Sequence, residues 1–274
     1  MPESLKDSAM RYHTHPTPGK LCIQPTKPLA NKRDLARAYS PGVAYACEAI
    51  VEDEAMAAAV TARGNLVGVI TNGTAVLGLG NIGPLASKPV MEGKAVLFKK
   101  FANIDVFDIE IQENEVDKLV DIIAALEPTF GGINLEDIKA PECFLVEQKL
   151  RERMKIPVFH DDQPGTAIVA AAAIYNGLRV VEKNIEDIKV VVSGSGAASI
   201  ACLDLLVSMG LPRTNISLID RLGVIYKGRG DGMNQWKEAY ARETDDRTLA
   251  DAMVGADLFM GLSAPGVLTQ DMVI

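Results

Sequence analysis

The sequence is poor in aromatic residues and has no long apolar run. Aromatic residues make up 5% of its 274 residues, with a single tryptophan, so the core must be built from Ala, Val, Ile and Leu. No run of about 18 uncharged apolar residues occurs, which argues against a membrane-spanning helix. The alanine-rich stretch 166–180 contains Asn176 and Arg179, and we expect it to form a buried helix. The N-terminus lacks the apolar segment of a signal peptide, so we expect a cytoplasmic protein.

Positive charge and paired cysteines are also scarce. The chain has 28 Lys and Arg against 36 Asp and Glu, a net charge of −8, which excludes a general nucleic-acid binder because phosphate backbones need a basic face. The cysteines form no CxxC pair, and their spacing fits no zinc motif. We expect all four to be reduced, small core residues. They are Cys22, Cys47, Cys143 and Cys202.

The remaining composition is that of a globular protein. It is 48% hydrophobic and 23% charged, and at roughly 150 residues per domain the length predicts two domains. We expect a substrate- and metal-binding domain over 1–163, which begins with an extended arm over 1–33. A nucleotide-binding domain should follow over 164–274. The predicted fold class is α/β, with an N-terminal α/β domain followed by a Rossmann-type, doubly wound domain.

Apolar periodicity and turn residues place the individual elements. Asn72-Gly73 between two apolar runs predicts a β-hairpin, and we expect Asp34 to cap the first helix. Strands are predicted at 103–111, 131–138, 156–162, 188–193, 216–220 and 257–262. Helices are predicted at 34–62 with a break at Ser40-Pro41-Gly42, and at 87–101, 115–126, 141–154, 166–180, 197–210 and 248–254.

Two glycine-rich loops compete for the role of dinucleotide fingerprint. GLGNIG, at 78–83, is a literal G-x-G-x-x-G, whereas GSGAAS, at 194–199, replaces the third glycine with Ser199. The fingerprint needs a parallel strand before it, a helix that opens directly at it, and an acid at the tip of the next strand. The loop at 194–199 meets all three conditions, while the predicted hairpin argues against the loop at 78–83. We therefore expect the nucleotide at Gly194, Ser195, Gly196, Ala197 and Ala198.

The choice of coenzyme depends on the residues around Asp220, which ends the next predicted strand. An acid at this position usually accepts hydrogen bonds from the ribose of NAD. However, Arg221 is adjacent, and Lys227, Arg229 and Lys237 follow, so cations are available for the 2′-phosphate of NADP. The sequence leaves both coenzymes open.

Acidic pairs follow two other predicted strands. Glu136-Asp137 comes after INL, and Asp161-Asp162 comes after a strand that ends in His160. In an open α/β sheet ligands lie beyond the carboxyl ends of the strands, and oxygen ligands suit Mg²⁺ or Mn²⁺. We therefore predict a divalent metal site, against the alternative of two solvent-exposed acidic loops. We assign no ligand role to His160, because hard cations prefer oxygen.

Two further side chains are candidates for proton transfer. Lys94 lies on an apolar helical face, where partial burial would lower its pKa and let it act as a base. The alternative is a lysine whose charged end reaches solvent. Tyr39 lies at the Ser40-Pro41-Gly42 break, where its phenol could point into a cleft.

Together, five segments resemble motifs of the malic enzymes. They are RDLARAYSPGVA, EGKAVLFKKFA, INLEDIKAP, FHDDQPGTA and VVSGSGAAS. The resemblance covers the chain from about residue 11 and is closest to the large bacterial hybrid type, which carries a phosphotransacetylase-like domain after its malic domain. It implies oxidative decarboxylation of malate to pyruvate and CO₂, with reduction of NADP or NAD, dependence on Mg²⁺ or Mn²⁺, and a homodimer or higher homo-oligomer.

The resemblance also implies residue roles. Tyr39 would be the general acid, Lys94 the general base, and Asp161 the residue that orients Lys94. The divalent metal would be held by Glu136, Asp137 and Asp162, and the coenzyme by the loop from Ser195 to Ala198. Ala75 stands where larger family members carry an arginine that contacts the substrate carboxylate.

The family's later strands and asparagine-bearing segments are absent from these 274 residues. A doubly wound dinucleotide domain usually has about six strands, so we expect its sheet to be unfinished here. Two alternatives remain: a metal-independent two-domain dehydrogenase for amino or hydroxy acids, and a catalytically incomplete fragment that binds nucleotide.

Overall fold

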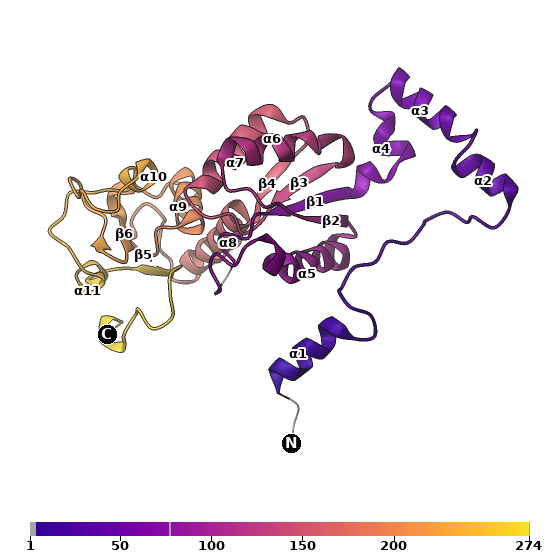
Figure 1. The fold of residues 1–274 in the computed structure, drawn as a ribbon. Helices are drawn as coiled ribbons and strands as arrows, with labels where there is room; N and C mark the ends of the chain where they lie inside the picture. Colours follow the sequence, from indigo (N-terminus) through magenta and orange to yellow (C-terminus); the bar gives the residue numbers. More distant parts are fainter. Residues whose placement is uncertain (1–3, 77, 274) are drawn as a thin grey trace. The chain divides into compact units, whose positions relative to one another are not determined.

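The computed structural model describes residues 4–76 and 78–273. The chain divides into two compact units, one of Met1–Ile138 with Leu145–Phe159 and the other of Lys139–Phe144 with His160–Ile274. Helices alternate with strands along the chain (Figure 1), and the strands form two four-stranded sheets. The predicted α/β fold class is therefore confirmed.

The first sheet has the strand order β2-β1-β3-β4. Its strands are β1 (Leu66–Thr71), β2 (Asp105–Glu110), β3 (Gly132–Leu135) and β4 (Val158–His160). β1 pairs in parallel with both β2 and β3. In Figure 1, α5 (Pro84–Ala102) covers one face of this sheet, and α6 (Val116–Ala125) and α7 (Glu142–Arg153) cover the other.

The core of the first sheet contains apolar side chains from the strands and from the helices that cover them. α6 buries Leu119, Val120 and Ile123 along one stripe, as expected for an amphipathic helix against a sheet. Both faces of the parallel strands are covered, so apolar residues fill successive positions; Val69 and Ile70 are both fully buried.

The N-terminal region differs from its predicted structure in two places. A helix, α1 (Leu5–Thr14), occupies part of the predicted extended arm, because the Ser4 side chain accepts a hydrogen bond from the backbone N–H of Asp7 and starts the helix. The first helix after the arm is capped by Asn31 and not by Asp34. The predicted break is confirmed, since α2 (Lys32–Ala38) ends before it and α3 (Val43–Glu52) begins after it; α4 (Met56–Val60) follows.

The predicted hairpin at Asn72-Gly73 is wrong. Among the described residues of 72–83 no second strand forms, and a single antiparallel bridge joins Val76 to Gly80; Leu77 lies outside the described residues. Gly73 has a φ of +65°, and its carbonyl accepts the N–H groups of Ile82 and Gly83. The loop therefore folds back on itself, and β1 finds its neighbours in later strands.

The loop ends where α5 begins, three residues earlier than the predicted position 87. Pro84 stands at the first helical turn, where its missing N–H has no cost. Pro89 lies inside the helix.

The second sheet has the order β7-β6-β5-β8. β5 (Val190–Ser193) pairs in parallel with β6 (Ile216–Asp220) and β8 (Leu258–Gly261), whereas β7 (Gly223–Val224) is antiparallel to β6. The predicted strands at 188–193, 216–220 and 257–262 are confirmed, and β7 was not predicted. The helices of this part are α8 (Thr166–Val180), α9 (Ala197–Ser208), α10 (Gln235–Glu238) and α11 (Leu249–Met253).

Short helical turns complete the chain: 3₁₀ turns at Ala62–Asn65, Glu127–Thr129, Arg213–Asn215 and Gln270–Met272, and a π-helical turn at Asp161–Gly165.

Two expectations about burial are corrected. α8 has the predicted bounds but buries only Ala167 and Ala171 among its residues, so it is a surface helix of this unit. Cys143 and Cys202 are buried free thiols, as expected, but Cys22 and Cys47 are exposed. No helix in the described part of the chain is long and apolar enough to cross a membrane.

Candidate active site

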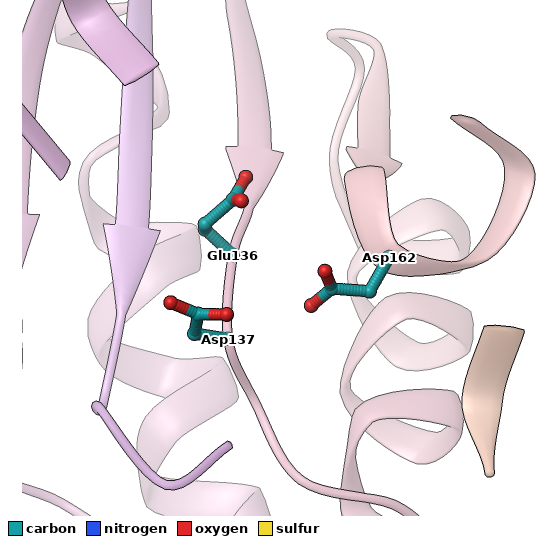
Figure 2. Close-up of side chains that lie close together, drawn as sticks. All are labelled: Glu136, Asp137 and Asp162. Atoms are coloured by element: carbon teal, nitrogen blue, oxygen red, sulfur yellow. The ribbon is translucent and has the colours of Figure 1, made fainter. Parts of the chain in front are cut away.

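Three carboxylates gather where two neighbouring strands end. Glu136 and Asp137 directly follow β3, and Asp162 lies two residues beyond the end of β4, its neighbour in the sheet. One oxygen of each lies within 4.8 Å of the others (Figure 2). Glu136 and Asp137 are buried, and Asp162 is half-buried. The structure therefore brings together the three residues for which the sequence predicted a metal.

A distorted backbone at Asp137 helps to form this group. Its φ of 55° is a left-handed conformation, which aspartate tolerates better than most residues. The carbonyl of Asp137 accepts the N–H of Ala75 at 2.9 Å, which ties the glycine-rich loop of residues 72–83 to the acidic turn. Ala75 thus contacts the site through its backbone.

Donors from a helix and from a strand hold the Glu136 carboxylate. Lys94 on α5 places its Nζ 3.0 Å from Oε1, with 20% of the lysine side chain exposed. Asn134 on β3 donates its Nδ2 to Oε2 at 2.9 Å. Lys94 was predicted at the site, and Asn134 was missed. Its only sequence signal is its position two residues before Glu136, which puts both side chains on one face of the chain.

The donor set fits a hard divalent cation. Buried carboxylates repel one another unless positive charge is close by, and here Lys94 supplies one such charge. The cluster offers oxygen atoms only, which is the ligand chemistry of Mg²⁺ and Mn²⁺.

His160 lies beside this group and is fully buried. Its Nδ1 is 4.0 Å from Oδ2 of Asp162. Burial lowers the pKa of His160 below its ordinary value of 6.5, against the opposing charges of Asp162 and Asp161. The imidazole is therefore neutral at neutral pH. Asp161 begins the π-helical turn, and its role toward Lys94 stays a prediction.

Tyr39 is not part of the carboxylate group. It ends α2 as the C-terminal cap, and 72% of the residue is exposed. Its role as general acid therefore stays a prediction from the resemblance alone.

The second glycine loop has the geometry of a dinucleotide site. β5 ends at Ser193, and α9 opens at Ala197 with Gly196 as its N-terminal cap, so free N–H groups of the helix face the loop. Gly194 has a φ of +116° and approaches the backbone of Leu262 so closely that a Cβ would lie 2.5 Å from its carbonyl oxygen. Ser199 is buried at the position of the third glycine, where a small side chain keeps the helix close to the sheet.

Asp220 lies at the end of β6, as predicted, but it is already engaged. Arg229 donates from Nη2 to both carboxylate oxygens, at 2.8 and 2.7 Å, and Lys237 donates to Oδ2 at 2.8 Å. The side chains of Asp220 and Arg229 are only 9% and 5% exposed. Burial would raise the pKa of Asp220, but the hydrogen bonds from Arg229 and Lys237 outweigh it and hold the pKa below 3.8. Arg221, also predicted to bind coenzyme, is exposed.

The first glycine loop was set aside partly for the wrong reason. GLGNIG does lie between a parallel strand and a helix, because β1 is followed by α5 and then by β2. What distinguishes it is the distance along the chain: residues 72–83 separate β1 from α5, so the helix does not open directly after the strand. The loop at 194–196, by contrast, joins β5 directly to α9.

Comparison with known proteins gives the family. Residues 18–115 and 112–151 match the model of the malic enzyme N-terminal domain, and residues 163–273 match that of the malic enzyme NAD binding domain. This chain belongs to the malic enzyme family. The match to the NAD binding domain includes Gly194 and does not include Gly78. The assignment of the coenzyme to residues 194–198 stays a prediction.

Individual malic enzymes are similar over the whole chain. The NADP-dependent malic enzyme of Haemophilus influenzae is 66% identical over 274 residues, which is all of this chain and 36% of that protein. The NAD-dependent malic enzyme of Rhizobium meliloti is 65% identical over 268 residues, covering 98% of this chain and 35% of that protein. The chain thus spans about a third of the length of these relatives.

A solved malic enzyme has the same fold. The NAD-dependent malic enzyme of Thermotoga maritima superposes with a TM-score of 0.90 at 41% identity, over 100% of this chain and 72% of that one. The predicted Rossmann-type fold of the second part is therefore confirmed.

Proposed function

We propose that this chain provides the malic site of an enzyme that converts malate to pyruvate and CO₂ while reducing NADP or NAD. The observation that carries the proposal is the group of three carboxylates within 4.8 Å, with Lys94 3.0 Å from Glu136. A cation site next to a lysine is what oxidation of a hydroxy acid followed by loss of CO₂ requires. The chain is 65–66% identical to relatives that are named malic enzymes, and this supports the same reaction.

The chain's own residues would bind, orient and move protons. Glu136, Asp137 and Asp162 would hold the divalent cation. When bound, that cation would make the substrate hydroxyl more acidic and stabilise negative charge on the oxygen after CO₂ leaves, while the nicotinamide would take up the hydride. Lys94 would accept the proton of the hydroxyl group.

Tyr39 would then donate a proton to the carbon that has lost CO₂. The helix N-terminus at Ala197 would bind the pyrophosphate of the coenzyme.

We further propose NADP as the preferred coenzyme. Both oxygens of Asp220 accept hydrogen bonds from Arg229 or Lys237, which reduces their capacity to accept from a ribose hydroxyl. One carboxylate faces two cations, so the tip of β6 carries an excess positive charge that suits a 2′-phosphate. The names of the relatives are divided between NADP and NAD, so this proposal depends on the charges alone.

The direct test is to measure pyruvate and reduced coenzyme formed from malate, with Mn²⁺ and after its removal by a chelator. We expect turnover that requires the metal. Turnover that continues without metal would refute the cation site and would favour the metal-independent dehydrogenase. Coenzyme binding without any turnover of malate would instead favour a nucleotide-binding fragment.

A further inference from the structure

The two carboxylate oxygens of Glu136 contact different donors. Oε1 faces the ammonium of Lys94 at 3.0 Å, and Oε2 accepts from Nδ2 of Asn134 at 2.9 Å. An ionised carboxylate has about four acceptor positions, so it can accept these two bonds and still act as a cation ligand. The two donors differ in nature, because Lys94 is a charge on a long side chain of a helix whereas Asn134 is a neutral amide on a strand.

Asn134 stands at a position where an apolar residue would be the ordinary choice. It lies in β3, an interior strand, opposite Val69 of β1 in the register. It is 2% exposed, and its neighbours Ile133 and Leu135 are buried and apolar. Strands of parallel sheets that are covered on both faces are normally apolar throughout.

The amide is also incompletely satisfied. Among the described residues, no donor reaches Oδ1 of Asn134, although the atom is buried. A buried acceptor without a donor destabilises the fold, because it has lost its hydrogen bonds to water. A leucine would fill similar space without this cost, so the amide has a local reason to be there. Its Nδ2 donates to Glu136, which is the side-chain hydrogen bond that the described residues show for it.

We propose that Asn134 is a positioning residue that keeps the Glu136 carboxylate turned toward Asp137 and Asp162. The proposal rests on the cation site of the proposed function. Lys94 attracts Glu136 toward α5, and this attraction competes with the cation for the same carboxylate. The bond from Asn134 holds the second oxygen on the side of the strand, so that the carboxylate stays in the cluster when a cation binds.

The test is Mn²⁺ binding, measured by electron paramagnetic resonance of free Mn²⁺ without malate or coenzyme. We expect Asn134→Leu to weaken Mn²⁺ binding about 10- to 100-fold, the usual effect of losing a group that orients a metal ligand. Asn134→Gln keeps the amide donor and should recover part of this loss. Should the leucine variant not fold, Asn134→Ser gives the same comparison, because its hydroxyl is too short to reach Glu136.

A matched control comes from the other sheet. Ser217 in β6 is fully buried, and its hydroxyl also has no partner among the described residues. Ser217→Ala should leave Mn²⁺ binding unchanged. Equal weakening in Ser217→Ala and Asn134→Leu would overturn the proposal, since it would indicate a general effect of altering buried polar groups.

The competition with Lys94 gives a second test. In a Lys94→Met background Glu136 is no longer attracted toward α5, so Asn134→Leu should weaken Mn²⁺ binding by a smaller factor than in the unsubstituted chain. The same factor in both backgrounds would overturn the positioning role, as would unaltered binding in Asn134→Leu. If the unsubstituted chain binds no Mn²⁺ at all, the cation site of the proposed function fails first, and the role of Asn134 fails with it.

Discussion

Gly194→Ala should destabilise the second unit without any change in its surface. The new Cβ would lie 2.5 Å from the carbonyl oxygen of Leu262, 2.8 Å from its carbon and 3.2 Å from the nitrogen of Ser263. All three atoms are backbone atoms, so no side chain can turn away. The φ of +116° adds strain of about 1–3 kcal/mol for a residue with a Cβ, and the overlap adds about 1–3 kcal/mol. The total loss of unfolding free energy is therefore about 2–6 kcal/mol.

The single tryptophan provides the assay. Trp236 stacks on Phe144 with ring centroids 4.6 Å apart, at the edge of the core that contains β5. Its fluorescence therefore reports unfolding of the unit that carries Gly194. At roughly 2–4 °C per kcal/mol, even a loss of 2 kcal/mol lowers the unfolding midpoint by about 4–8 °C.

Gly196→Ala is the matched control, two residues away in the same loop. Gly196 has a φ of −83°, and an added Cβ meets nothing within 4 Å. Its free energy of unfolding should change by no more than about 0.5 kcal/mol, as expected for a surface substitution. Because its backbone would face the pyrophosphate, Gly196→Ala should instead raise the KM for the coenzyme. An unchanged midpoint in Gly194→Ala, or equal losses in both variants, would refute the reasoning.

Three further outcomes can be measured. Lys94→Met should lower kcat about 10²- to 10⁴-fold as a lost base, while Mn²⁺ binding does not weaken because a competing cation is removed; weaker Mn²⁺ binding would mean that Lys94 holds the cluster together. Lys237→Gln should lower kcat/KM for NADP more than for NAD, and equal losses would contradict the proposed preference for NADP. The lowered pKa of Asp220 contributes stability that is complete above its ordinary value of 3.8 and is lost as pH falls through the lower, folded-state value. The difference in unfolding free energy between the unsubstituted chain and Asp220→Asn should therefore be constant near neutrality and shrink below pH 3.8; a difference that grows on acidification would contradict this sign.

Local patterns predicted most helices and strands correctly where a single pattern of residues was present. The helix at 166–180 and the strand that ends at Asp220 have the predicted bounds, because alanine-rich and β-branched runs have a single favourable conformation. The hairpin at Asn72-Gly73 failed because the same dipeptide suits any tight turn, and the partners of β1 lie far along the chain. Helix α1 was missed because the proline-rich composition around it obscured the cap at Ser4.

The site was predictable to the same degree. The acidic pairs, Lys94 and the glycine loop at 194–199 could be named from their positions at strand ends and on a helix face. Asn134 was not named, since its position two residues before Glu136 shows that both side chains share a face but not that they form a hydrogen bond. The pairing of Asp220 with Arg229 could not be predicted either, because it depends on a turn that returns the chain to the end of the strand nine residues later.

By itself, the sequence determined most of the strands and helices, the family, and the types of chemical group available, because these depend on neighbouring residues and on short motifs. Only the tertiary structure decided which groups meet. It joined Glu136 and Asp137 to Asp162 by making β3 and β4 neighbours, and it gave Glu136 its two donors from a helix and a strand. The physical reason is that hydrogen bonds and ion pairs act over a few ångströms in space, whereas a sequence records only separation along the chain.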